Sequence, residues 1–122
     1  MVDSTVDGAG DSILGRGTLF CERCTIKSRG VMMWPRNHEG VHGNVFKDST
    51  FIGTQQPTTI ARSPRNESFT YPFAEVVLLN ATLTNISPEG WSDADKGGKV
   101  RFWEFGSKNP DGTLVDVSRR VP

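Results

Sequence analysis

The sequence predicts an all-β protein whose short strands stack as a parallel β-helix. The 122 residues include 13 glycines and 7 prolines, about one residue in six, which favours turns over long helices. No stretch carries apolar residues at helical spacing without a glycine or proline inside it. A four-residue pattern recurs at intervals of 20, 25 and 32 residues, a range typical of solenoid repeats.

The repeat consists of a polar residue, a small residue, a threonine and an apolar residue. In a stacked solenoid each small residue lies on its counterpart in the next turn of the chain, and the apolar residues form a continuous core. The alternative is a set of ordinary antiparallel strands in which the pattern recurs by chance. The four copies are Asp3-Ser4-Thr5-Val6, Arg23-Cys24-Thr25-Ile26, Asp48-Ser49-Thr50-Phe51 and Asn80-Ala81-Thr82-Leu83.

Short apolar runs bounded by turn residues predict the individual strands. Two longer segments, Met32–Gly43 and Gly53–Pro72, are expected to be loops, and loops of this length often carry function. No cap is visible at Met1, so we expect a solenoid that is truncated at its N-terminal end and self-associates through this uncapped rung. The predicted strands are Gly17–Phe20, Val45–Phe46, Thr50–Ile52, Ala74–Leu79, Thr82–Ile86, Lys99–Phe105 and Thr113–Val117.

Charge and hydropathy exclude several classes of partner. Fourteen basic residues balance fourteen acidic ones, so the sequence indicates no surface for nucleic acid or anionic lipid. No apolar run approaches the roughly 18 residues that a membrane helix needs. The first ten residues lack the basic start and the apolar stretch of a signal peptide.

The cysteines and histidines have the spacing of a zinc finger, with Cys21 and Cys24 followed by His38 and His42. Gly40 lies between the two histidines and disfavours the helix on which a finger would carry them. The repeat explains both cysteines without metal, as a core residue and as a small stacking residue. Free cysteine is among the most buried residue types, so two buried free cysteines are the favoured interpretation.

Two charged residues are candidates for chemistry. Asp11 lies within the glycine-rich stretch from Gly8 to Gly17, which is expected to turn tightly between rungs, and it stands between two short apolar elements. Arg62 follows an apolar pair, and an arginine that orients a carboxylate suits a nucleophilic site. The alternatives are a solvated turn aspartate and an exposed loop arginine.

Trp91 lies at an expected turn, where it either stacks on a sugar ring or covers the core.

These residues together resemble the pectinesterase (pectin methylesterase) family, whose fold is a right-handed parallel β-helix. Gly8 to Gly15 falls on the family's motif Gly-Asp-Val-Asp-Phe-Ile-Phe-Gly, and Asp11 matches its nucleophilic aspartate. Ile60 to Pro64 falls on the motif Leu-Gly-Arg-Pro-Trp, and Arg62 matches the arginine that pairs with the nucleophile. By this resemblance residues 1–122 are the C-terminal portion of the family's catalytic domain, a match that continues through Pro88-Glu89-Gly90-Trp91 and the segment from Arg101 to Ser107.

The resemblance implies a secreted enzyme of the cell wall that hydrolyses methyl esters of galacturonan, the backbone of pectin. Asp11 is then the nucleophile, Arg62 orients it, and Leu14 and Trp91 are expected to contact the substrate. The reaction needs no metal and no other cofactor.

The sequence departs from the family at places that matter for this chemistry. Ser12 and Leu14 replace two phenylalanines, and Ser63-Pro64 stands where the family has Pro-Trp. The upstream motif Gln-Asp-Thr-Leu, which supplies the acid/base aspartate and a glutamine, has no match in this chain. We therefore expect a pectinesterase-like chain that is inactive by itself. The alternatives are a non-catalytic polysaccharide-binding module and a truncated remnant without function.

Overall fold

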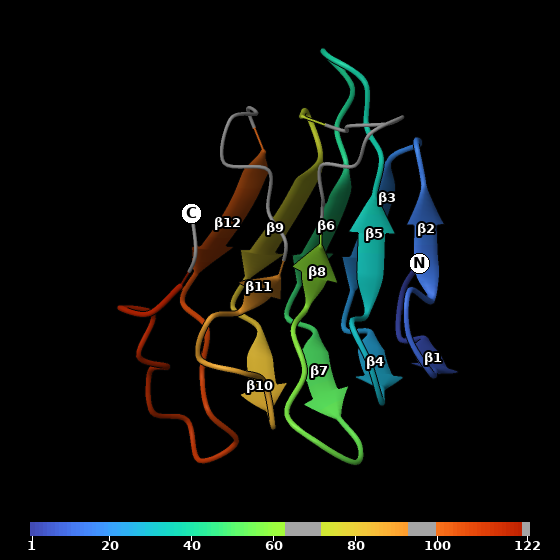
Figure 1. Ribbon diagram of the computed structural model, residues 1–122. Coiled ribbons are helices and arrows are strands. Elements are labelled where there is room, and N and C mark those ends of the chain that lie inside the picture. The colour runs from blue at the N-terminus through green and yellow to red at the C-terminus, as the bar shows by residue number, and fades with distance from the viewer. Residues whose placement is uncertain (63–71, 93–99, 121–122) are drawn as a thin grey trace.

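The computed structural model describes residues 1–62, 72–92 and 100–120. Within these residues the chain forms twelve strands and no helix, and all of its strand pairs are parallel. The strands lie in three four-stranded sheets, each of which takes one strand from every turn of the chain (Figure 1). The predicted parallel β-helix is confirmed.

Each turn of the solenoid is here called a rung. The sheets are numbered in the order in which the chain enters them. Sheet 1 contains β1 (Thr5–Gly8), β4 (Thr25–Ser28), β7 (Thr50–Gly53) and β10 (Thr82–Thr84). Sheet 2 contains β2 (Ile13–Gly15), β5 (Met33–Pro35), β8 (Ala61–Arg62) and β11 (Trp91–Ser92). Sheet 3 contains β3 (Leu19–Glu22), β6 (Asn44–Lys47), β9 (Glu75–Leu79) and β12 (Arg101–Phe105).

The turn from sheet 3 to sheet 1 explains the four-residue repeat. Its first residue is left-handed in every copy, with φ of 50° at Asp3, 52° at Arg23, 51° at Asp48 and 56° at Asn80. Aspartate and asparagine tolerate this conformation because their short side chains hydrogen-bond locally. The four N–H groups donate to carbonyls of the following rung over 2.8 to 3.0 Å, so the turns stack directly on one another.

Arg23 is the exception among these four residues, because arginine has no such preference for the left-handed region. Its Nε donates to Asp3 Oδ1 of the preceding rung at 2.8 Å, and its guanidinium also contacts Glu22. The hydrogen bond from Arg23 lowers the pKa of Asp3 below its usual value. An exposed ion pair therefore links the first two turns.

The structure contains a fifth copy of the repeat that the sequence pattern does not show. Gly106 is left-handed with φ of 69°, Ser107 is buried, and the Lys108 N–H donates to the Ala81 carbonyl at 2.8 Å. In the preceding rung, the Thr82 N–H donates to the Ser49 carbonyl in the same way, at 2.9 Å. Glycine replaces the polar residue and lysine replaces threonine, which hides this copy from the pattern.

The residues after this fifth copy fold back over the C-terminal end of the solenoid. Lys108 forms an antiparallel bridge with Leu114, and Val115 packs against the core. The predicted strand Thr113–Val117 is wrong, because this segment makes one bridge and otherwise covers the last rung. Arg120 closes the cap through an ion pair with Glu104, in which Nε lies 2.8 Å from Oε1.

Inward side chains of all three sheets form one core. The columns include Ile26, Phe51 and Leu83 from sheet 1, and Cys21, Phe46 and Leu78 from sheet 3. Cys21 and Cys24 occupy the predicted core and small positions and are fully buried. They are not free, however, because a disulfide joins them. The prediction of two free cysteines is therefore wrong.

The segment Met32–Gly43 is not a loop throughout, because Met33–Pro35 forms β5 in the middle of sheet 2. The predicted strand Gly17–Phe20 begins later, at Leu19, and extends to Glu22. Strand β2 lies in the stretch that the sequence assigned to a glycine-rich turn. Lys99, Ser63 and Pro64, together with the rest of 63–71 in the predicted loop Gly53–Pro72, lie outside the described residues.

The first rung has open strand edges. In the part of the chain that the structure describes, β1 and β2 each pair with a strand on one side only, at the blue end of the ribbon in Figure 1. Residues 1–3 cover part of the free edge of β3, where the Glu22 N–H donates to the Met1 carbonyl at 3.0 Å. Self-association through this rung stays a prediction.

The fifth copy makes a stability prediction for Gly106→Ala. An L-residue in the left-handed region costs about 1–2 kcal/mol, and an added Cβ would lie 2.7 Å from Asn80 Oδ1. We expect urea unfolding to show a loss of this size. Gly17→Ala is the matched control, because its added Cβ has no heavy atom within 4 Å, and it should change stability by less than about 0.5 kcal/mol. Equal losses in the two variants would contradict the fifth turn.

Candidate functional site

The candidate site lies on the outer face of sheet 2. Met33, Ala61 and Trp91 are buried partners in neighbouring strands, so they point into the core. Because side chains alternate along a strand, the residue that follows each of them points outward. Leu14 is the register partner of Trp34, and Ser92 is the partner of Arg62. The outer row across the sheet is therefore Leu14, Trp34, Arg62 and Ser92.

Asp11 lies just before β2, at the edge of this face. Its backbone is left-handed with φ of 44°, and its N–H donates to the Val31 carbonyl at 2.5 Å. Aspartate visits this region at some cost, and such conformations persist where the surrounding structure fixes them. The turn aims the carboxylate of Asp11 across β5 toward β8.

Asp11 and Arg62 form a two-point ion pair, although they are 51 residues apart in sequence. Arg62 Nε donates to Oδ1 at 3.0 Å and Nη2 donates to Oδ2 at 2.6 Å. The side chain of Asp11 is 31% exposed and that of Arg62 is 28% exposed. The fork therefore fixes the orientation of a carboxylate that solvent can still reach. The structure brings together the two residues that the sequence proposed as a pair.

A hollow of about 220 Å³ opens beside this ion pair and is lined by Gly10, Asp11, Val31 and Arg62. Asp11 is the one carboxylate among these four residues, and none of them has a side-chain amide. The hollow can thus place a small group against the carboxylate. Beside that carboxylate, the described lining offers the guanidinium of Arg62 as a hydrogen-bond donor.

Trp34 joins this site, and the sequence analysis did not select it. The Cζ atom of Arg62 lies 4.3 Å from the centroid of the indole, so the guanidinium contacts both Asp11 and an aromatic face. Arg36 Cζ lies 4.0 Å from the same ring. The apolar run Met32-Met33-Trp34 is the strand signal that could have identified this residue.

The two predicted substrate contacts have different locations. Leu14 is 53% exposed and lies beside Trp34 on the outer face. Trp91 is 2% exposed and packs against Phe102, with ring centroids 5.1 Å apart. Its indole therefore covers the core, which was the alternative role for this residue, and the structure does not bring it to the site.

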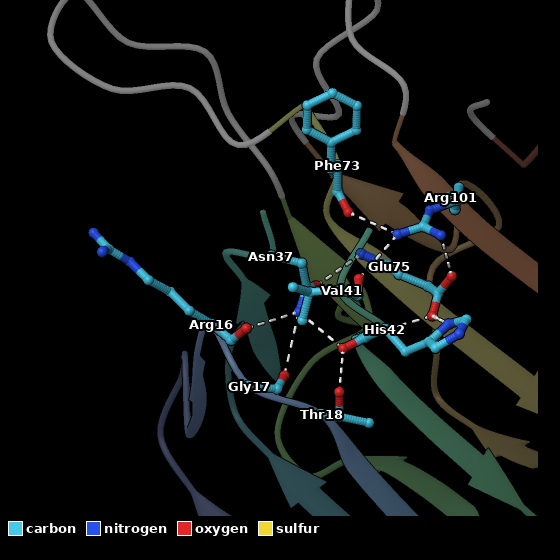
Figure 2. Close-up of polar contacts among 10 residues, drawn as sticks. Arg16, Gly17, Thr18, Asn37, Val41, His42, Phe73, Glu75 and Arg101 are labelled. Carbon is cyan, nitrogen blue, oxygen red and sulfur yellow. Dashed lines mark hydrogen bonds and ion pairs between the residues drawn. The ribbon is translucent and has the colours of Figure 1, made fainter. Parts of the chain in front are cut away.

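A buried carboxylate holds the segment that follows β5. Glu75 points to the outer side of sheet 3, yet its side chain is only 4% exposed. Arg101 Nη1 lies 2.8 Å from Glu75 Oε2, while the Gly43 N–H at 3.0 Å and His42 Nδ1 at 3.3 Å contact Oε1. Figure 2 shows Arg101 and His42 on either side of this carboxylate.

Asn37 completes this cluster (Figure 2). Its Oδ1 accepts the Glu75 N–H at 3.1 Å, and its Nδ2 donates to the carbonyls of Arg16, Gly17 and His42 at 3.2 to 3.3 Å. The Thr18 hydroxyl also donates to the His42 carbonyl, at 2.6 Å. Asn37 lies two residues beyond Pro35, the last residue of β5. Its buried amide thus connects the end of β5 to the turn after β2 and to β9.

The zinc-finger alternative is not assembled. Its two cysteines are joined in a disulfide, and His42 contacts Glu75. Within the described ranges no three His, Cys, Asp or Glu side chains lie close enough to share a metal ion.

Comparisons with known proteins add no assignment. No family model, no curated protein and no solved structure matches the chain. The described residues include no helix long and apolar enough to cross a bilayer.

A double-mutant cycle measures the ion pair. Asp11→Asn keeps a residue that tolerates the left-handed turn, and Arg62→Met removes the fork while keeping a long side chain. We expect urea unfolding to give a coupling free energy of about 1 kcal/mol or more that falls as salt is added. The control is the exposed pair of Arg119 and Glu89, which has one contact at 3.3 Å. Its cycle (Arg119→Met, Glu89→Gln) should give about 0.5 kcal/mol or less. Equal coupling in the two cycles would contradict a fixed pair at the site.

Proposed function

We propose that this chain carries the nucleophile of a pectinesterase-like site that acts on methyl-esterified galacturonan. The observation that carries the proposal is the two-point ion pair between Asp11 and Arg62 on the outer face of sheet 2. A carboxylate that is oriented by an arginine fork and open to solvent suits attack on an ester carbonyl. The resemblance of the surrounding motifs to pectinesterases supplies the substrate class.

In this mechanism a carboxylate oxygen of Asp11 attacks the carbonyl carbon of a galacturonate methyl ester. The tetrahedral intermediate collapses to a mixed anhydride and expels methoxide, which takes one proton from solvent and leaves as methanol. Water then hydrolyses the anhydride to a galacturonate carboxylate and free Asp11, and two protons pass to solvent. Arg62 keeps the attacking oxygen aimed throughout. Leu14, which is exposed beside Trp34, offers an apolar contact suited to the C–H face of a sugar ring or to the ester methyl group.

The residues around Asp11 indicate that this chain hydrolyses the methyl ester slowly. A fast esterase needs a carboxyl group to protonate the leaving methanol and donors for the oxyanion, and loss of one such donor alone costs about 10²–10³ in rate. Among the residues that the structure describes, those lining the hollow beside Asp11 supply neither a second carboxyl group nor an amide side chain. We therefore propose that the 122-residue chain binds the polysaccharide and hydrolyses it slowly at best.

The second candidate is a non-catalytic module that binds the same polysaccharide. The outward row of Leu14, Trp34 and Arg62 favours it, because this row offers an exposed leucine and a partly exposed cation whether or not Asp11 reacts. Secretion is part of both proposals. The Cys21–Cys24 disulfide supports it, since disulfides persist in oxidising compartments.

Methanol release from methyl-esterified oligogalacturonides, measured beside their binding to the purified chain, tests the proposal. We expect binding, together with a trace of methanol release that Asp11→Asn abolishes without weakening binding. Leu14→Ala is the control for the polysaccharide surface and should weaken binding while the chain stays folded. Binding with no Asp11-dependent release would favour the module, and the absence of binding would contradict both candidates.

A further inference from the structure

The guanidinium of Arg62 is held on two sides. Its edge donates to both oxygens of Asp11, and its Cζ lies 4.3 Å from the centroid of the Trp34 ring. An arginine side chain has several free torsions, so an edge contact alone leaves its plane free to tilt and swing. A planar cation that also rests on an aromatic ring keeps one orientation.

The position of Trp34 follows from the order of strands in sheet 2. Arg62 lies on β8 and Asp11 lies just before β2, while β5 runs between those strands. Neighbouring strands are about 4.8 Å apart, so the side chains of Arg62 and Asp11 together span nearly 10 Å across β5. The Trp34 indole points outward from β5 and occupies this path.

Trp34 is itself well fixed. Met33 and Pro35, on either side of it, are fully buried, so the strand cannot rotate without opening the core. The guanidinium of Arg36 lies over the same indole, and the backbone N–H of Arg36 donates to the Gly15 carbonyl at 2.8 Å. Asn37, the next residue, is held by the cluster around Glu75. The ring is therefore a rigid support for the guanidinium.

We propose that Trp34 is a positioning residue, whose indole holds the Arg62 guanidinium in the plane that presents both of its N–H donors to Asp11. Trp34 acts through Arg62, and its loss frees the fork and with it the Asp11 carboxylate. The catalytic consequence rests on the proposed function, whereas the positioning itself does not.

The Nε–H proton of Arg62 reports this arrangement directly in NMR spectra of the ¹⁵N-labelled chain. In the wild-type protein we expect it to be shielded by the indole ring and protected from exchange by its bond to Asp11 Oδ1, and its signal is assigned by its loss in Arg62→Lys. The free energy of a cation–π contact corresponds to a roughly tenfold change in the population of conformers in which the Arg62 fork is released from Asp11. We therefore expect Trp34→Leu to speed exchange of this proton with water about tenfold and to remove the ring-current shift.

Two further variants make the result specific. Trp34→Phe keeps an aromatic face and should retain most of the protection, which also keeps the test open if Trp34→Leu does not fold. Leu14→Ala removes the register partner of Trp34 on the same face and should leave the Nε–H signal unchanged. Unchanged exchange in a folded Trp34→Leu chain would overturn the proposal, and so would equal loss of protection in Leu14→Ala.

The two proposals fail separately. If Asp11-dependent methanol release is absent, the esterase proposal is overturned, but the Nε–H exchange still decides the role of Trp34. If release is measurable, Trp34→Leu should lower it about as much as Arg62→Lys does, and Trp34→Phe should restore most of it. Full activity in Trp34→Leu would overturn the positioning role.

Discussion

The register in which the rungs stack is the constraint on which the remaining structure depends. It is fixed at the turn from sheet 3 to sheet 1, where a left-handed residue in each rung donates its N–H to the next. A slip by one residue would turn every inward side chain to the surface. Phe46, Phe51 and the two buried cysteines would then be exposed to solvent. The turns and the core therefore enforce the same register, and the Gly106 turn continues it into the cap.

The site is a consequence of that register. Asp11, Trp34 and Arg62 come from three successive rungs and meet because β2, β5 and β8 are adjacent in sheet 2. No single rung contains the site, so the energetic cost of the left-handed Asp11 is supported by the whole stack. The Glu75 cluster adds a second support, because it covers sheet 3 with the segment that leaves β5. The candidate site is thus built on strands, with its supporting contacts in a buried polar cluster.

The sequence predicted what depends on repetition and missed what depends on irregular packing. The small-residue column and the apolar core were readable because Ser49, Ala81 and their equivalents recur at a fixed place. Strand β5 was missed because Pro35 ends it after three residues and mimics a loop. The motifs identify Asp11 and Arg62, but the contact between the two side chains depends on the tertiary structure, because they lie on different rungs. Trp34 had no motif, and Trp91, which had one, is buried because it faces inward beside Phe102.

The central claim is that four rungs place one row of side chains on the outer face of sheet 2, and a distance measurement tests it most directly. Spin labels at Leu14→Cys and Ser92→Cys would lie at the two ends of this row, and the native cysteines are protected by their disulfide. Three strand spacings predict a narrow distribution of separations near about 15 Å. A broad distribution, or a mean far beyond three strand spacings, would contradict the stacked row and the site built on it.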